Sequence, residues 1–210
     1  YALMVSLEVA ENIDLPIYYK KENLLELAHK AKAWLESDPK AFYEWVNDNK
    51  TVQLERIVRY FKAWKDFRED NNVDLKLPSG FEFTILATNN FHEDESDDIA
   101  FRETVRNIYN ELSKDEGFKC LRPTAPKDED VFSSYSAQRK TNFLNTLKSL
   151  LDDLDRAKNE KNFKKASEIL INHQFGNRFP VGEDKTEEDK SSDLSRSLAA
   201  SSIIPKPYAK

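Results

Sequence analysis

Larger apolar side chains alternate with small or polar ones over the first ten residues. The alternating positions on the apolar side are Tyr1, Leu3, Val5, Leu7 and Val9. A period of two residues is typical of a strand with one buried face, so this pattern predicts a strand over residues 1–10. Because a strand at the first residue needs partners, we expect further strands of the same sheet upstream and interpret the chain as a fragment.

A second strand is predicted over Ile13–Tyr18, where Ile13, Leu15 and Ile17 share one face. Pro16 removes a backbone donor from the ladder, which indicates an edge strand. Asp14 projects from the face without the aliphatic stripe. Aspartate is depleted in strands, so its presence here requires a specific reason, either chemistry or the blocking of edge-to-edge aggregation.

After Lys20 the apolar period changes to about 3.6 residues, which predicts helices. The expected helical segments are 24–34, 39–46, 53–67, 79–86, 97–112, 143–154 and 163–170. Gly176 is the expected C-cap of the last helix. From Val181 onward charged and small residues dominate without a period, so residues 181–210 are predicted to be disordered. The fold class expected is α+β, with two edge strands followed by a mainly helical domain.

Composition narrows the functional classes. The chain has 210 residues, 39% of them hydrophobic, with 32 basic and 38 acidic residues that give a net charge of −6. This balance argues against nonspecific binding to nucleic acid or membrane surfaces by the whole chain. The single Cys120 excludes an internal disulfide and is expected to be a small buried apolar residue in a reducing, cytoplasmic setting. His29, His92 and His173 are far apart in sequence and are predicted to be structural.

Two segments carry candidate chemistry. Lys62 falls at the edge of the apolar stripe of the segment 53–67, beside Val58, and Lys65 lies one turn further along. Ser79 precedes a predicted helix, whose free N–H groups form a ready site for an anion. A plainly structural interpretation stays open for each, because Lys62 can extend along the apolar surface to solvent and Ser79 can simply cap its helix.

Several sequence blocks in a fixed order carry a family resemblance. They are IDLPIYY, SDPKAFYEWVN, RIVRYFKAWKDF, LPSGFEFTILA, DDIAFRETVRNIYNEL, RPTAPKDEDVF and FGNRFP. Together they resemble the CD-NTases, the bacterial cGAS/DncV-like nucleotidyltransferases that make cyclic oligonucleotide signals, over about residues 1–180. The resemblance implies the end of a nucleotidyltransferase catalytic core at 1–20, a helical nucleotide-binding domain at 21–180 and a tail at 181–210, in a truncated polymerase-β-like architecture.

The resemblance also implies roles for individual residues. Asp14 matches the third carboxylate that holds two Mg²⁺ ions in such enzymes, Lys62 the lysine that reaches the donor triphosphate, and Ser79 the serine at the same phosphates. Lys65 is a weaker nucleotide-binding candidate. The implied full-length protein is an anti-phage (CBASS) synthase, which joins ATP and/or GTP into a cyclic di- or trinucleotide by two-metal transfer.

The chain also departs from the family pattern. None of its four glycines is followed by serine, and Asp-x-Asp occurs only at Asp128/Asp130 and Asp153/Asp155, outside any predicted strand. One carboxylate cannot hold two metal ions, so this polypeptide alone is predicted to lack synthase activity. Gly80 follows Ser79 where family members often carry an aromatic residue for base stacking.

An alternative function is an interaction module. The end of the chain, SSIIPKPYAK, is small-residue rich and locally apolar. A partner could order such a segment on binding. In many operons of the resembling family an E1/E2-like enzyme conjugates the synthase through its C-terminus, which makes Pro207, Tyr208 and Ala209 the candidate partner residues.

Overall fold

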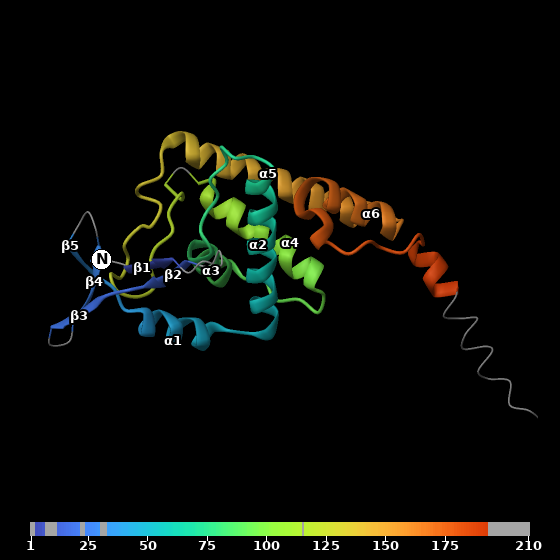
Figure 1. The fold of residues 1–210 in the computed structure, drawn as a ribbon. Helices are drawn as coiled ribbons and strands as arrows, with labels where there is room; N and C mark the ends of the chain where they lie inside the picture. Colours follow the sequence, from blue (N-terminus) through green and yellow to red (C-terminus); the bar gives the residue numbers. More distant parts are fainter. Residues whose placement is uncertain (1–2, 7–11, 22–23, 30–32, 115, 193–210) are drawn as a thin grey trace, which may run out of the picture.

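The strands of the protein lie at the N-terminal end of the chain. The structure, a computed structural model, describes residues 3–6, 12–21, 24–29, 33–114 and 116–192. Its strands are β1 (Leu3–Ser6), β2 (Asn12–Leu15), β3 (Tyr18–Lys21), β4 (Leu24–His29) and β5 (Ala33–Glu36). β1 pairs with β2, and β3, β4 and β5 form a second antiparallel sheet (Figure 1). The strand predicted within residues 1–10 is confirmed for its described part, Leu3–Ser6. The strand predicted over 13–18 is confirmed only as far as Leu15, since Pro16 and Ile17 lie outside any strand and Tyr18 opens β3.

The rest of the described chain is mainly helical, with loops between the helices. They are α1 (Pro39–Asn49), α2 (Val52–Asp70), α3 (Gly80–Asn90), α4 (Asp97–Leu112), α5 (Ala137–Asn159) and α6 (Phe163–Leu170). A π-helical turn, η1 (Ile171–Phe175), and a 3-10 turn, η2 (Gly176–Arg178), follow α6. Gly176, predicted as the C-cap of the last helix, caps the π-helical turn η1 at φ 60°, while the C-cap of α6 itself is Ile171. The α+β fold class is confirmed.

The helix predicted over residues 24–34 is wrong, because this segment forms β4 and β5. Leu27 of β4 lies between Tyr18 of β3 and Leu35 of β5 in the sheet register. A short apolar run such as LLELA fits a helical and an extended pattern equally well. Pairing with β3, which local sequence does not report, decides between them.

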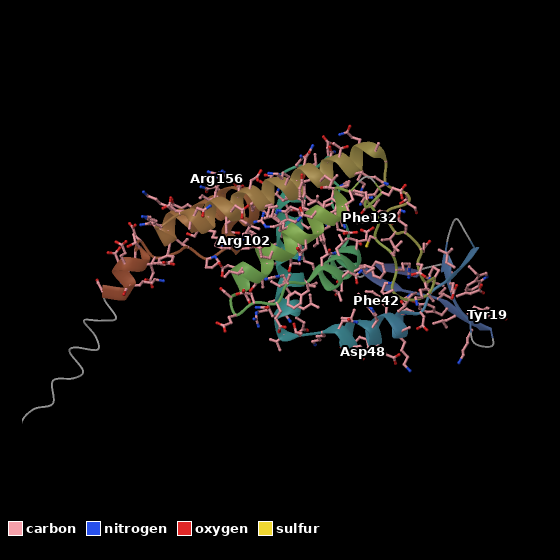
Figure 2. The ribbon with its side chains drawn as sticks, turned by 180° about the vertical axis from the view of Figure 1, so that it is seen from behind. Tyr19, Phe42, Asp48, Arg102, Phe132 and Arg156 are labelled. Atoms are coloured by element: carbon pink, nitrogen blue, oxygen red, sulfur yellow. The ribbon has the colours of Figure 1, made fainter. Side chains whose placement is uncertain are left out.

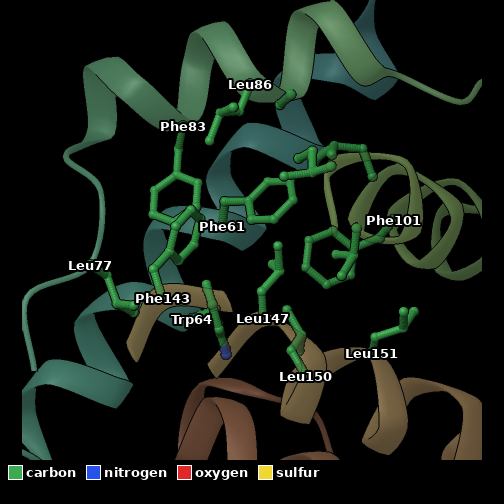
Figure 3. Packing of buried hydrophobic residues seen from close by; sticks show 14 of the residues in the cluster. Phe61, Trp64, Leu77, Phe83, Leu86, Phe101, Phe143, Leu147, Leu150 and Leu151 are labelled. Atoms are coloured by element: carbon green, nitrogen blue, oxygen red, sulfur yellow. The ribbon is translucent and has the colours of Figure 1, made fainter. Parts of the chain in front are cut away.

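The hydrophobic core lies between α2, α3, α4 and α5. Figure 3 shows Phe61, Phe83, Phe101 and Phe143 converging there from these four helices. The rings of Phe61 and Phe83 are stacked with centroids 5.2 Å apart. The predicted stripe of α2 is confirmed, since Leu54, Ile57, Phe61 and Trp64 are all buried. Cys120 is buried as well, and burial raises the pKa of its thiol to about 12.

A buried polar network fixes the rotation of α2. The indole Nε1–H of Trp64 donates to Oε1 of Gln174 at 2.9 Å. The amide of Gln174 in turn donates to Oδ2 of Asp153 on α5 at 2.7 Å. Because Gln174 is fully buried, these bonds are not exchanged for bonds to water, and they hold α2 against η1 and α5. The face on which α2 presents Lys62 is set by this arrangement.

The disorder predicted from Val181 is wrong for the described part of that segment. The N–H of Gly182 donates to Oγ of Ser167 on α6 at 2.8 Å, and the amine of Lys190 lies 4.0 Å from the ring centroid of Phe163. Residues 187–192 are helical. A segment without a period of its own is held here by contacts with α6, which its composition does not reveal. Residues 193–210 lie outside the described chain.

Candidate functional site: the N-terminus of α3

The N-terminus of α3 is built by reciprocal capping. Oγ of Ser79 accepts the N–H of Glu82 at 3.3 Å, and Oε2 of Glu82 accepts the N–H of Ser79 at 2.5 Å. First-turn N–H groups have no partner within their helix, so those of Gly80 and Phe81 remain as donors beside the exposed Ser79. The Ser79 hydroxyl keeps its hydrogen for a further acceptor.

Tyr135, just before α5, and Arg139, in the first turn of α5, hold this cap in place. The hydroxyl of Tyr135 donates to Oε2 of Glu82 at 3.0 Å. The guanidinium of Arg139 donates to the Tyr135 hydroxyl at 2.9 Å and to the carbonyl of Leu77 at 3.1 Å. Burial, with the charge of Glu82 adding to it, raises the pKa of Tyr135 far above its ordinary value, so this hydroxyl stays a donor. The loop that carries Ser79 is therefore rigidly supported.

Lys62 lies directly against this helix end. A Cβ placed on Gly80 would stand 3.1 Å from Cε of Lys62, so the lysine packs on the glycine more closely than it could on a side chain without a small shift. Lys62 is exposed, and within the described part of the chain no carboxylate forms an ion pair with it. The structure thus brings together the two predicted residues Lys62 and Ser79, which are far apart in sequence. A free cation, a hydroxyl and two backbone N–H groups share one corner.

Lys65 is occupied elsewhere. Its amine lies 2.5 Å from Oε2 of Glu69, and Oε1 of Glu69 accepts the N–H of Leu77 at 2.8 Å. This pair ties α2 to the loop before Ser79. We interpret Lys65 as a support of the site, and its predicted contact with nucleotide stays a prediction.

The remaining predicted residues are not brought to this corner by anything the structure describes. Asp14 lies in β2 opposite Met4, and its side chain is outside the description. Pro207, Tyr208 and Ala209 fall in the range 193–210, which is likewise outside it. No group of three metal-ligating side chains occurs among the described residues. Within those same residues, no helix is long and apolar enough to cross a membrane.

Sequence reasoning missed an aromatic and cationic cluster next to the site. The rings of Phe42 on α1 and Phe81 on α3 lie with centroids 4.7 Å apart, and the guanidinium of Arg122 lies 5.2 Å from the Phe81 centroid. Figure 2 shows Phe42 in the half of the molecule that carries the strands, away from Arg156. No local pattern joins these three residues. The capping box, in contrast, was readable as Ser79-x-x-Glu82.

A family model and the similar curated proteins all describe cyclic oligonucleotide synthases. Residues 51–188 match the family model described as the cyclic GMP-AMP synthase, C-terminal domain. A cyclic GMP-AMP synthase of Escherichia albertii is 33% identical over 105 residues, covering 48% of this chain and 23% of that protein. A cyclic AMP-AMP-AMP synthase of Acinetobacter sp. is 28% identical over 177 residues, covering 81% of this chain and 50% of that protein. The chain thus spans no more than about half the length of these relatives.

Solved structures show the same fold. The Vibrio cholerae DncV cyclic AMP-GMP synthase in complex with the linear intermediate pppA(3',5')pG has a TM-score of 0.67 at 21% identity, over 80% of this chain and 50% of that one. The 3'-deoxy ATP bound form of Vibrio cholerae DncV also gives a TM-score of 0.67, at 24% identity over 80% of this chain and 46% of that one.

Proposed function

Since this chain belongs to the CD-NTase family, of which it carries a C-terminal portion, we propose that it binds the triphosphate of a nucleotide substrate between Lys62 and the N-terminus of α3. The observation that carries this proposal is the position of Lys62, exposed and packed on Gly80 directly beside Ser79. The complete protein would be a cyclic oligonucleotide synthase of anti-phage (CBASS) defence, using ATP and/or GTP.

The proposed chemistry is positioning and charge neutralisation. The amine of Lys62 and the partial positive charge of the helix end attract phosphate oxygens, and the N–H groups of Gly80 and Phe81 with the Ser79 hydroxyl orient them. Holding the triphosphate in one geometry presents its reacting phosphorus to an attacking hydroxyl. The rigid cap beneath Ser79 favours this, because preorganised donors need no rearrangement during reaction.

The two Mg²⁺ ions expected in the complete enzyme do not fit the described part of this chain, which holds no cluster of three metal-ligating side chains. Asp14 remains the proposed metal ligand from this chain. Residues 1–210 alone are proposed to bind triphosphate without forming a cyclic product.

The test is calorimetric titration of the 210-residue chain with inorganic tripolyphosphate. Lys62→Met keeps most of the apolar stem and removes the charge, so affinity should fall about tenfold or more, as expected for a lost charge-assisted contact. Lys161→Met, in the exposed turn before α6, is the matched control and should leave affinity unchanged. Equal affinity in the Lys62 variant and the unmodified chain, with both folded, would refute the proposal.

A further inference from the structure

Arg122, in the loop between α4 and α5, packs against Phe81 in the first turn of α3, next to the proposed triphosphate site. Its guanidinium carbon is 5.2 Å from the ring centroid of Phe81, the residue after Gly80. Two residues earlier, Sγ of Cys120 lies 4.0 Å from the carbonyl oxygen of Glu82. Two separate contacts therefore place this loop against the helix end that carries Ser79.

The guanidinium of Arg122 is poorly satisfied by its own chain. Its Nη2 reaches the carbonyl of Ala125 only at 3.3 Å, and its Nη1 forms a long ion pair with Oε2 of Glu129 at 3.7 Å, beyond hydrogen-bond distance. Its buried Nε has no hydrogen-bond partner among the described residues. Buried donors in proteins are nearly always paired, and here, within the described chain, neither Nε nor the terminal nitrogens have a close partner. The side chain is 24% exposed, so its terminal nitrogens are the donors that an acceptor from outside could reach.

Arg139 provides the contrast, because it also lies over an aromatic ring. Its guanidinium carbon is 3.5 Å from the centroid of Tyr135, and it donates to two backbone carbonyls and the Tyr135 hydroxyl at 2.9 to 3.1 Å. These hydrogen bonds of Arg139 are all to acceptors of the protein itself and hold the loop before α3. Arg122 is held less closely by its own chain, with the Ala125 carbonyl at 3.3 Å and the Glu129 carboxylate at 3.7 Å, although both side chains are partly buried.

We propose that Arg122 is a second cationic residue of the triphosphate site, whose guanidinium binds phosphate oxygens of the nucleotide that Lys62 and Ser79 hold. This inference rests on the proposed function and extends it. A planar guanidinium binds two phosphate oxygens at once, whereas the lysine amine acts as a point charge. A second cation is also needed on electrostatic grounds, because the buried carboxylate of Glu82 lies at the same helix end and repels an anion.

The experiment is titration of the 210-residue chain and its variants with inorganic tripolyphosphate. Arg122→Gln should weaken binding about tenfold or more, and Arg122→Lys, which keeps the charge but loses the fork, should weaken it less. Lys127→Gln is the matched control, because this lysine is exposed in the same loop and its loss changes the net charge equally. Binding by the Lys127 variant should equal that of the unmodified chain.

The outcomes separate the two proposals. If Lys62→Met weakens binding and Arg122→Gln does not, the triphosphate site stands and the assignment of Arg122 is overturned. If neither variant changes the affinity, or the unmodified chain binds no tripolyphosphate, the site itself fails and Arg122 with it. Equal losses in the Arg122 and Lys127 variants would indicate general electrostatic attraction and would also overturn the assignment. Thermal unfolding of each variant shows that it is folded.

Discussion

Two helix N-termini in this protein, those of α3 and α4, each face a cation from helix α2. Only at α4 does a carboxylate of the described chain pair with that cation. At α4, the carboxylate of Asp97 accepts from Arg56 at 2.5 Å, from Gln53 at 3.0 Å and from Tyr60 at 2.9 Å. At α3, the facing residue is Lys62, and its amine has no carboxylate partner within the described chain. The protein supplies its own anion at α4 and leaves the corner at α3 open to one from outside.

The difference separates a structural helix end from a binding one. The charge of Asp97 lies at the positive end of α4 and is paired with Arg56, which ties α4 to α2. At α3 the negative charge of Glu82 is turned into the protein, toward Tyr135 and the cap. The outward donors of Ser79, Gly80 and Phe81 are left unopposed. A cation near a helix N-terminus therefore indicates a site only where the protein provides no counter-charge.

The largest expected effect is a loss of folding stability when the ion pair at the N-terminus of α4 is removed. Asp97→Ala removes the acceptor of three side chains and should lower the free energy of unfolding by about 2 kcal/mol. Because 28% of the Asp97 side chain is exposed, the loss should stay below that of a fully buried pair. Urea unfolding measures the change, with Asp98→Ala as the control at the same helix end. Tripolyphosphate binding should be unaffected, and a parallel loss of binding would contradict the division of roles.

A smaller effect is expected from pH at the same corner. The hydrogen bond from Arg56, followed by those from Gln53 and Tyr60, holds the pKa of Asp97 well below its usual range. A carboxyl with a depressed folded-state pKa contributes its full stabilisation above its unfolded pKa of about 3.9. It loses that contribution progressively as pH falls from there through the lower folded-state pKa. The stability difference between the unmodified chain and Asp97→Ala should therefore shrink between pH 6 and pH 3. A difference that stays constant in urea titrations at both pH values would show that the charge of Asp97 is not the cause.

Local patterns in the sequence predicted much of α1 to α6, and the reason is physical. The apolar residues of α2 that face the core recur at helical spacing, as in Leu54, Ile57, Phe61 and Trp64. Helix N-caps such as Ser79 are single residues of a type that strongly prefers this position. The segment containing β4 failed because its apolar residues fit two periods, and only pairing with β3 selects one. The prediction of disorder from Val181 failed for the same reason. The contacts of Gly182 and Lys190 with α6 depend on a surface that the local sequence does not contain.

Two residues of the candidate site could be identified from the sequence, but their proximity in the fold could not. Lys62 and Ser79 were identified from position and family resemblance, and the structure brings them together through Gly80. Arg122 was not identified, because its place beside Phe81 depends on a long loop that packs on α3. The occupation of Lys65 by Glu69 is an i to i+4 contact and was within reach of the sequence.

The finest test of the comparison changes the charge at the α3 corner and keeps its shape. Glu82→Gln retains a capping box, because a glutamine oxygen can still accept the N–H of Ser79 and the hydroxyl of Tyr135. It removes the negative charge in the first turn of α3, which opposes an anion at this helix end. Affinity for tripolyphosphate should therefore rise about threefold, an effect of the size that a screened charge near the protein surface exerts.

The direction of this change is what discriminates. A corner that is only structural, like that of α4, gains nothing in anion affinity when its carboxylate is neutralised, and the variant would simply be less stable. Glu103→Gln on α4 is the control, because it removes an equal charge from a partly buried glutamate that pairs with Arg102 and Arg106. If calorimetric titration shows the same small gain in both variants, net charge explains it and the α3 corner has no special role. A gain confined to Glu82→Gln places the anion at α3, because only there does the carboxylate share a helix end with Lys62.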